Sequence, residues 1–112
     1  MRLTNKKAFV KLKKKNRGNV SLSNAIDKLI KDIEDSEWKN QTELNHIRPD
    51  ADCVHNDGFY FFNVRIHRTM ILIEFDHDEA SVVWVGTHQE YETTFKNNKN
   101  TIKKWLHAND WI

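Results

Sequence analysis

The order of apolar and polar residues predicts two amphipathic helices near the N-terminus. The first covers residues 4–16 and the second lies within residues 21–38, because apolar residues recur there at helical spacing. Gly18 ends the first helix, and Ser21 or Ser23 can cap the second. The apolar positions are Ala8, Phe9 and Leu12 in the first helix and Leu22, Ala25, Ile26, Leu29, Ile30 and Ile33 in the second.

Two shorter helical segments follow the same logic. Residues 40–47 begin with Asn40, which forms a capping-box pattern with Glu43, and Pro49 closes the segment. Near the C-terminus, one apolar stripe predicts a last helix that covers part of a sheet. That stripe consists of Ile102, Trp105 and Leu106.

After residue 52 the pattern changes to the alternation that is typical of strands. Three short apolar runs, at 59–66, 69–75 and 80–87, predict an antiparallel meander with His67 and Arg68 at its first turn. In the resulting register, the face toward the helices carries Tyr60, Phe62, Val64, Ile71, Ile73 and Phe75. The opposite face collects Phe61, Asn63, Arg65, Met70, Leu72 and Glu74, a mixture that can hold a ligand.

Together these elements predict an α+β protein, with two N-terminal helices packed on a twisted antiparallel sheet and a C-terminal helix. The length of 112 residues is typical of one domain. We therefore expect a single domain over residues 1–112, with a basic helical segment at 1–17 and a C-terminal helical extension at 95–112.

Charge is distributed unevenly along the chain. The first 17 residues hold eight cations and no acid, whereas the rest holds ten basic and sixteen acidic residues. A concentrated basic block favours a polyanionic partner, so RNA, DNA or an acidic protein would qualify. The eight cations are Arg2, Lys6, Lys7, Lys11, Lys13, Lys14, Lys15 and Arg17.

Cysteine content and hydropathy bear on location. The single cysteine, Cys53, excludes an internal disulfide and a thiolate zinc cage, and it fits a reducing compartment. No apolar run approaches the roughly 18 residues of a membrane span, and no signal-peptide pattern follows the basic N-terminus. We therefore expect a cytoplasmic protein with no membrane partner.

The segment VGTHQEYE, residues 85–92, carries the candidate chemistry. Gly86 permits a bend after the last strand, beyond which His88, Glu90 and Tyr91 follow. Cleavage of RNA without a metal requires a base for the 2′-hydroxyl, an acid for the leaving 5′-oxygen, and cations around phosphorus. His88 can be that base or acid, because the ordinary pKa of histidine is close to neutrality.

Other residues can complete such a site. Tyr91 can donate a proton or a hydrogen bond to a phosphate oxygen, and Arg65 or Arg68 offers a planar fork that suits phosphate. Phe61 or Trp84 could stack against a base. Each residue also has a plainer interpretation, since polar residues after a strand are commonly surface groups, lysine clusters are commonly solvated, and tryptophans commonly pack in cores.

A metal site is the weaker alternative. Asp76–Glu79 with His55 or His67 could supply oxygen and nitrogen ligands. A polar hairpin turn explains these consecutive residues better, because neighbours in sequence seldom converge on one ion. We expect neither a metal nor a cofactor.

Three segments resemble a known family. They are DIEDSEWKNQTELNHIRPDADCV, FFNVRIHRTMILIEF and VVWVGTHQEYE, and they resemble the HigB toxins of type II toxin-antitoxin systems, within the RelE-like superfamily. The likeness runs from about residue 32 to residue 92. Its motifs are THxEY (Thr87, His88, Glu90, Tyr91), the positions Trp38, Pro49, Asp50 and Asp52, and the strand Phe62-Asn63-Val64.

The resemblance implies a RelE-like fold and a metal-independent endoribonuclease that cuts messenger RNA, often on the translating ribosome. It also implies neutralisation by a HigA-like helix-turn-helix antitoxin, with operator DNA contacted only through the complex. His88 and Tyr91 would then be catalytic, together with Arg65 or Arg68. RNA would be bound by Lys6, Lys7, Lys11, Lys13, Lys14, Lys15, Arg17, Phe61 and Trp84.

One departure from the family pattern leaves an alternative open. Relatives usually carry an arginine where this chain has Met70, so the cation at the phosphate must come from Arg68 or Arg65. The alternative is a catalytically inactive member that binds RNA or the ribosome, or that serves only as an antitoxin partner. A stand-alone DNA-binding protein ranks last, because no helix-turn-helix pattern is present.

Overall fold

The chain forms five α-helices, one short 3-10 helix and one five-stranded sheet, and a computed structural model describes all residues 1–112. In chain order the elements are β1 (Arg2–Thr4), α1 (Lys7–Lys15), α2 (Val20–Glu34), α3 (Gln41–Ile47), β2 (Asp52–His55), β3 (Phe59–Val64), β4 (His67–Glu74), η1 (Phe75–His77), β5 (Glu79–Thr87), α4 (His88–Phe95) and α5 (Lys99–Ala108). The predicted α+β class is therefore confirmed. No helix is both long and apolar enough to cross a membrane.

The sheet has the order β1-β5-β4-β3-β2. Its β2 to β5 strands are antiparallel, which confirms the predicted meander, and β1 pairs with β5 in parallel. The predicted basic helical segment at 1–17 is helical only in part, because residues 2–4 form β1 and helix α1 begins at Lys7 rather than at residue 4. Three residues are too few to show a periodic pattern, so the sequence hid this strand.

The two faces of β3 and β4 carry the residues that the sequence predicted for them, although the pairing between the strands is different. Tyr60 lies opposite Ile71, and the predicted apolar set packs in one core toward the N-terminal helices. The turn, however, was misplaced. It consists of Arg65 and Ile66, so His67 and Arg68 lie inside β4 rather than at the turn.

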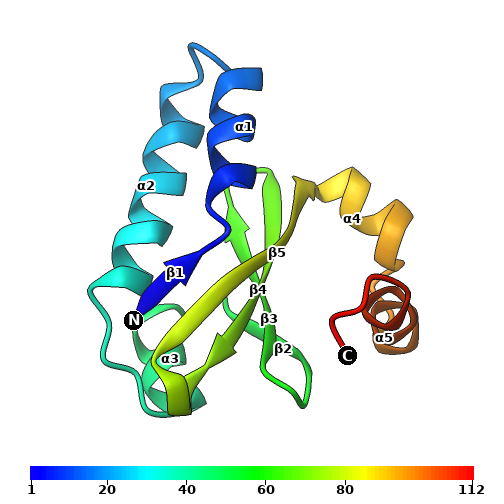
Figure 1. Cartoon of the computed structure of the whole chain (residues 1–112). Helices are drawn as coiled ribbons and strands as arrows, with labels where there is room; N and C mark the ends of the chain where they lie inside the picture. Colours follow the sequence, from blue (N-terminus) through cyan, green and yellow to red (C-terminus); the bar gives the residue numbers. More distant parts are fainter.

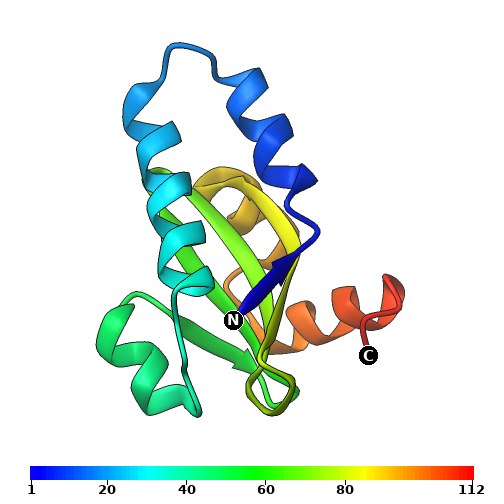
Figure 2. The same cartoon turned by 60° about the vertical axis from the view of Figure 1, so that its left-hand side comes forward.

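The two faces of the sheet carry two different apolar cores. Helices α1, α2 and α3 contribute Phe9, Ile26 and Leu44 to the first core, whereas α4 and α5 contribute Phe95 and Leu106 to the second. Figure 1 shows α1 and α2 side by side on one side of the sheet and α4 and α5 on the other. Figure 2 shows the link between α1 and α2 projecting beyond the sheet.

Helix α4 was not predicted. Its eight residues bury only Tyr91 and Phe95, which are four positions apart, so the apolar signal is weak. The caps of α2 also differ from expectation, because the Asn19 side chain, rather than Ser21 or Ser23, accepts the backbone N–H of Leu22.

Because α4 and α5 cover the second face, most of that face is not available to a ligand. Phe61 and Met70 are fully buried in the second core. The expectation that this whole face could hold a ligand was therefore wrong. Its end near the β3–β4 turn, where Asn63 is exposed and Arg68 is half-buried, stays open.

Candidate active site

Helix α4 is fixed at its first residue to the end of the β3–β4 hairpin. The Thr87 hydroxyl accepts the backbone N–H of Glu90, and the Glu90 carboxylate accepts the backbone N–H of Thr87, which completes a capping box. That backbone bond holds the pKa of Glu90 below its usual range. His88 donates its backbone N–H to the carbonyl oxygen of Ile66 at 2.9 Å. Glu90 therefore has a structural task, and His88 is held at the hairpin.

His88 projects into solvent beside a carboxylate. Its side chain is 63% exposed, and Nε2 lies 3.5 Å from Oε1 of Glu92, four residues further along α4. The His88 ring also stacks on the Tyr91 ring, with 5.8 Å between centroids and 24° between planes. The His88 imidazole and the Glu92 carboxylate, which can both exchange protons, thus lie together on the exposed side of α4.

Tyr91 is buried and its hydroxyl is engaged. Only 2% of the residue is exposed, and the hydroxyl donates to Oδ1 of Asn97 at 2.9 Å. The expected proton donation from Tyr91 to a phosphate therefore lacks a free hydroxyl in this arrangement. The Tyr91 ring instead packs against the His88 ring and the Arg68 guanidinium.

The guanidinium of Arg68 lies over the rings of Tyr91 and Phe61. Its guanidinium carbon is 4.3 Å from the Tyr91 ring centroid and 5.0 Å from that of Phe61. Such stacking fixes the planar fork and leaves its charge available, since no carboxylate pairs with Arg68. Arg68 shares a strand face with Met70 because the two are separated by two positions.

The remaining predicted residues divide into accessible and inaccessible ones. Arg65 is exposed in the turn with a φ of 59°, which is the left-handed region. Phe61 offers no ring face to a base, so its predicted role in stacking was wrong. Trp84 is half-buried against Gly86 and lines a groove of about 400 Å³, so its contact with RNA stays a prediction.

The basic N-terminal residues lie mostly on the outside of α1. Lys6 pairs with Glu34 and Lys13 pairs with Asp27, so two of the seven predicted RNA contacts are already neutralised within the protein. The other five are exposed and form no ion pair. They are Lys7, Lys11, Lys14, Lys15 and Arg17.

His67 is the second histidine near this end of the sheet. It is 5% exposed, its Nδ1 has no hydrogen-bond partner, and burial lowers its pKa below the ordinary value. Lys15 acts in the same direction, while the Glu90 carboxylate opposes it. His67 is therefore enclosed and its neutral form is favoured, whereas His88 is the accessible histidine of the candidate site.

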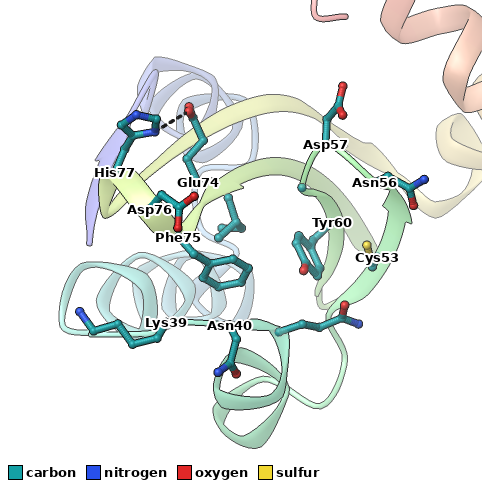
Figure 3. Close-up of a pocket in the computed structure, with 13 residues that line it drawn as sticks. Lys39, Asn40, Cys53, Asn56, Asp57, Tyr60, Glu74, Phe75, Asp76 and His77 are labelled. Carbon is teal, nitrogen blue, oxygen red and sulfur yellow. Dashed lines mark ion pairs between the residues drawn. The ribbon is translucent and has the colours of Figure 1, made fainter.

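A separate cavity of about 570 Å³ lies at the other end of β4 (Figure 3). Its lining includes Tyr60 and Phe75, with Glu74 and His77 paired at 3.3 Å on the rim. Burial, with the Cys53 thiol beside it, raises the pKa of Tyr60 to about 12. None of the predicted catalytic residues lines this cavity. No group of three or more His, Cys, Asp or Glu residues is arranged to hold a metal ion.

Two neighbours of the candidate site, Glu92 and Asn97, were not predicted from the sequence. Glu92 could have been found, since it follows His88 at the i, i+4 spacing of a helix. Asn97 could not, because it meets Tyr91 only through the turn that ends α4.

The amino-acid sequence matches a known protein family, and the match shows the class to which this protein belongs. Residues 22–94, well over half of the chain, match a model described as a RelE-like toxic component of a toxin-antitoxin system. Within that class the chain belongs to the HigB toxin family. Membership implies an antitoxin partner. The match leaves out β1, α1 and α5, and no curated protein matches the chain.

Proposed function

We propose that this toxin is a metal-independent endoribonuclease that cuts messenger RNA, on the ribosome and in the cytoplasm, and thereby inhibits translation. The observation that carries the proposal is the group formed by His88, Glu92 and Arg68 at the open end of the sheet. It combines an accessible imidazole, a carboxylate 3.5 Å from it, and a guanidinium held by stacking. Those are the groups that attack by a ribose 2′-hydroxyl requires.

In the proposed reaction, the Glu92 carboxylate takes the proton of the 2′-hydroxyl, and the 2′-oxygen attacks phosphorus. The bond from phosphorus to the 5′-oxygen breaks, and the His88 imidazolium gives its proton to that oxygen. A 2′,3′-cyclic phosphate and a 5′-hydroxyl result. Arg68, with Arg65 in the turn, stabilises the charge that builds on the phosphoryl oxygens.

The partner that controls this activity is, in our proposal, a HigA-like antitoxin with a helix-turn-helix domain. Operator DNA is then contacted through the complex rather than by the toxin alone. The alternative is an inactive RNA-binding or antitoxin-partner protein, and its support is Met70, where relatives usually carry arginine. The position of Arg68 over Tyr91 weighs against this alternative, because it returns a cation to the same face.

Expression of the toxin without its antitoxin, with mapping of messenger RNA 5′ ends, tests the proposal. New 5′-hydroxyl ends and growth arrest are expected. Arrest without new ends would indicate a toxin that binds without cutting, and neither effect would favour the inert partner.

The basic helix supplies a second testable expectation. Lys7, Lys11 and Lys14 fall on one side of α1, opposite Phe9, because their spacing is that of neighbouring helical turns. Replacing all three with glutamine should weaken RNA binding and flatten the logarithmic salt dependence by about 2, since each phosphate contact of a single strand contributes about 0.7. Affinities measured at several salt concentrations check this.

A matched control removes three lysines from α5 (Lys99, Lys103 and Lys104), which are also exposed. This triple variant has the same net charge as the α1 variant. Equal loss of affinity in both would mean that general charge, rather than the surface of α1, attracts the RNA.

A further inference from the structure

Asn63, at the end of β3, has an unusual combination of a fixed backbone and a free side chain. Strand β2 pairs with β3 only as far as Phe61, so no strand covers the backbone groups of Asn63 on that side. Its N–H donates instead to Oδ2 of Asp50 at 2.9 Å, and its carbonyl oxygen accepts Nη2 of Arg48 at 3.1 Å. Two side chains thus replace the missing strand.

These two side chains are themselves firmly placed. Arg48 is 11% exposed, bonds to Asp50 at 2.8 Å and to Asp32 at 3.2 Å, and lies over the Phe62 ring. Charged groups that are this enclosed are costly to desolvate and become tolerable only through such mutual bonds. The network therefore immobilises the backbone at one exposed residue.

The side chain of Asn63 is left without any hydrogen bond in the protein. It is exposed and lies directly across the hairpin from Arg68, its register partner. Residues opposite each other on neighbouring strands have Cβ atoms about 5 Å apart. Asn63 is therefore the cross-strand neighbour of Arg68, the residue that meets the phosphate in the proposed function.

The chemistry of an amide differs from that of the cation beside it. A phosphate oxygen only accepts hydrogen bonds, which suits Arg68, whereas an amide presents one donor group and one acceptor side by side. Paired donor and acceptor positions occur on the edges of unstacked nucleobases. A rigid backbone reduces the entropy that such recognition costs.

We propose that Asn63 is a nucleobase-reading residue, which selects the base of a nucleotide next to the cleaved phosphate, while Arg48 and Asp50 act as its positioning residues. This inference rests on the proposed function, because it concerns the RNA that His88 and Arg68 would cut. It assigns the substrate preference to a side chain outside the reacting groups.

Sequencing of the cleavage ends produced from a random RNA pool tests the inference. Wild type should enrich one base at a fixed offset from the cut. Asn63→Ala should reduce that enrichment about fivefold or more, which is the discrimination that a paired amide provides, with total cleavage within about tenfold of wild type. Asn63→Asp, which replaces the donor group by an acceptor, should change which base is preferred.

Asn56 provides the matched control, because it is also exposed and lies in the turn at the other end of β3. Asn56→Ala should keep the wild-type enrichment. Unchanged enrichment in Asn63→Ala, or equal loss in both variants, would overturn the assignment while leaving the nuclease intact. An absence of cleavage by folded wild type would instead refute the proposed function, and the assignment with it. Thermal unfolding of each variant verifies the fold, since the bonds of Asn63 use its backbone.

Discussion

Replacing His88 with alanine should abolish growth arrest in cells that lack the antitoxin, and new messenger RNA 5′-hydroxyl ends should disappear with it. The imidazole is the accessible proton donor of the proposed site, and loss of a general acid or base typically costs about 10²- to 10⁴-fold in rate. His88 is 63% exposed and its backbone, not its side chain, holds the hairpin, so the fold should be unaffected. Growth curves and end mapping of the two strains measure the effect.

The chain offers a close control for this substitution. His77 is also exposed and also has a carboxylate partner, Glu74, at 3.3 Å, but it lies at the opposite end of β4. His77→Ala should arrest growth like wild type. Arrest that survives in His88→Ala at equal protein levels would refute His88 as an essential group.

Arg68→Ala should lower the cleavage rate by about 10²-fold, because it removes the cation that stabilises charge on phosphorus. Arg68→Lys should recover only part of the activity, since lysine keeps the charge but not the planar fork. Both rates can be measured on one RNA oligonucleotide with purified protein. Arg2, which is exposed on β1, supplies the control, and Arg2→Ala should cleave like wild type.

Met70, which shares a strand face with Arg68, gives a second test of which residue supplies the cation at the phosphate. Met70 is fully buried beside Phe61 in the second core. Met70→Arg should therefore lower the free energy of unfolding by several kcal/mol rather than restore activity, because it buries an unpaired charge. Unfolding curves measured for Met70→Arg and wild type check this.

If Arg68→Ala cleaves as fast as wild type, the cation at the phosphate must be another residue, and Arg65 is the next candidate.

The alternation of apolar and polar residues along the strands was the most informative pattern in the sequence, because it predicted which side chains face the N-terminal helices. Tyr60, Phe62 and Ile71 were assigned to the correct face because a period of two leaves only two choices. Helix α4 was missed, since Tyr91 and Phe95 alone give too weak a stripe, although the pattern of Thr87 and Glu90 is a readable capping box.

Long-range contacts explain the rest of the difference. The bonds of Arg48 and Asp50 to Asn63 join residues 13 to 15 positions apart, and no local pattern indicates them. The hydroxyl of Tyr91 looked reactive in the sequence because its partner Asn97 lies beyond a turn that the sequence does not define. Motifs thus located the candidate site, while packing decided which of its groups are free to react.

The parallel pairing of β1 with β5 bears on how the toxin is made in the cell. Strand β1 is synthesised before the other strands, but it can pair with the sheet only after residues 79–81 of β5 have been synthesised. Closing so long a loop is slow, and pairing of distant segments delays folding. Helix α4 is translated later still, so the proposed nuclease site cannot assemble while the nascent chain is short. The proposed activity would then begin only after α4 has been synthesised, so an antitoxin that is present at that moment can bind before any cleavage.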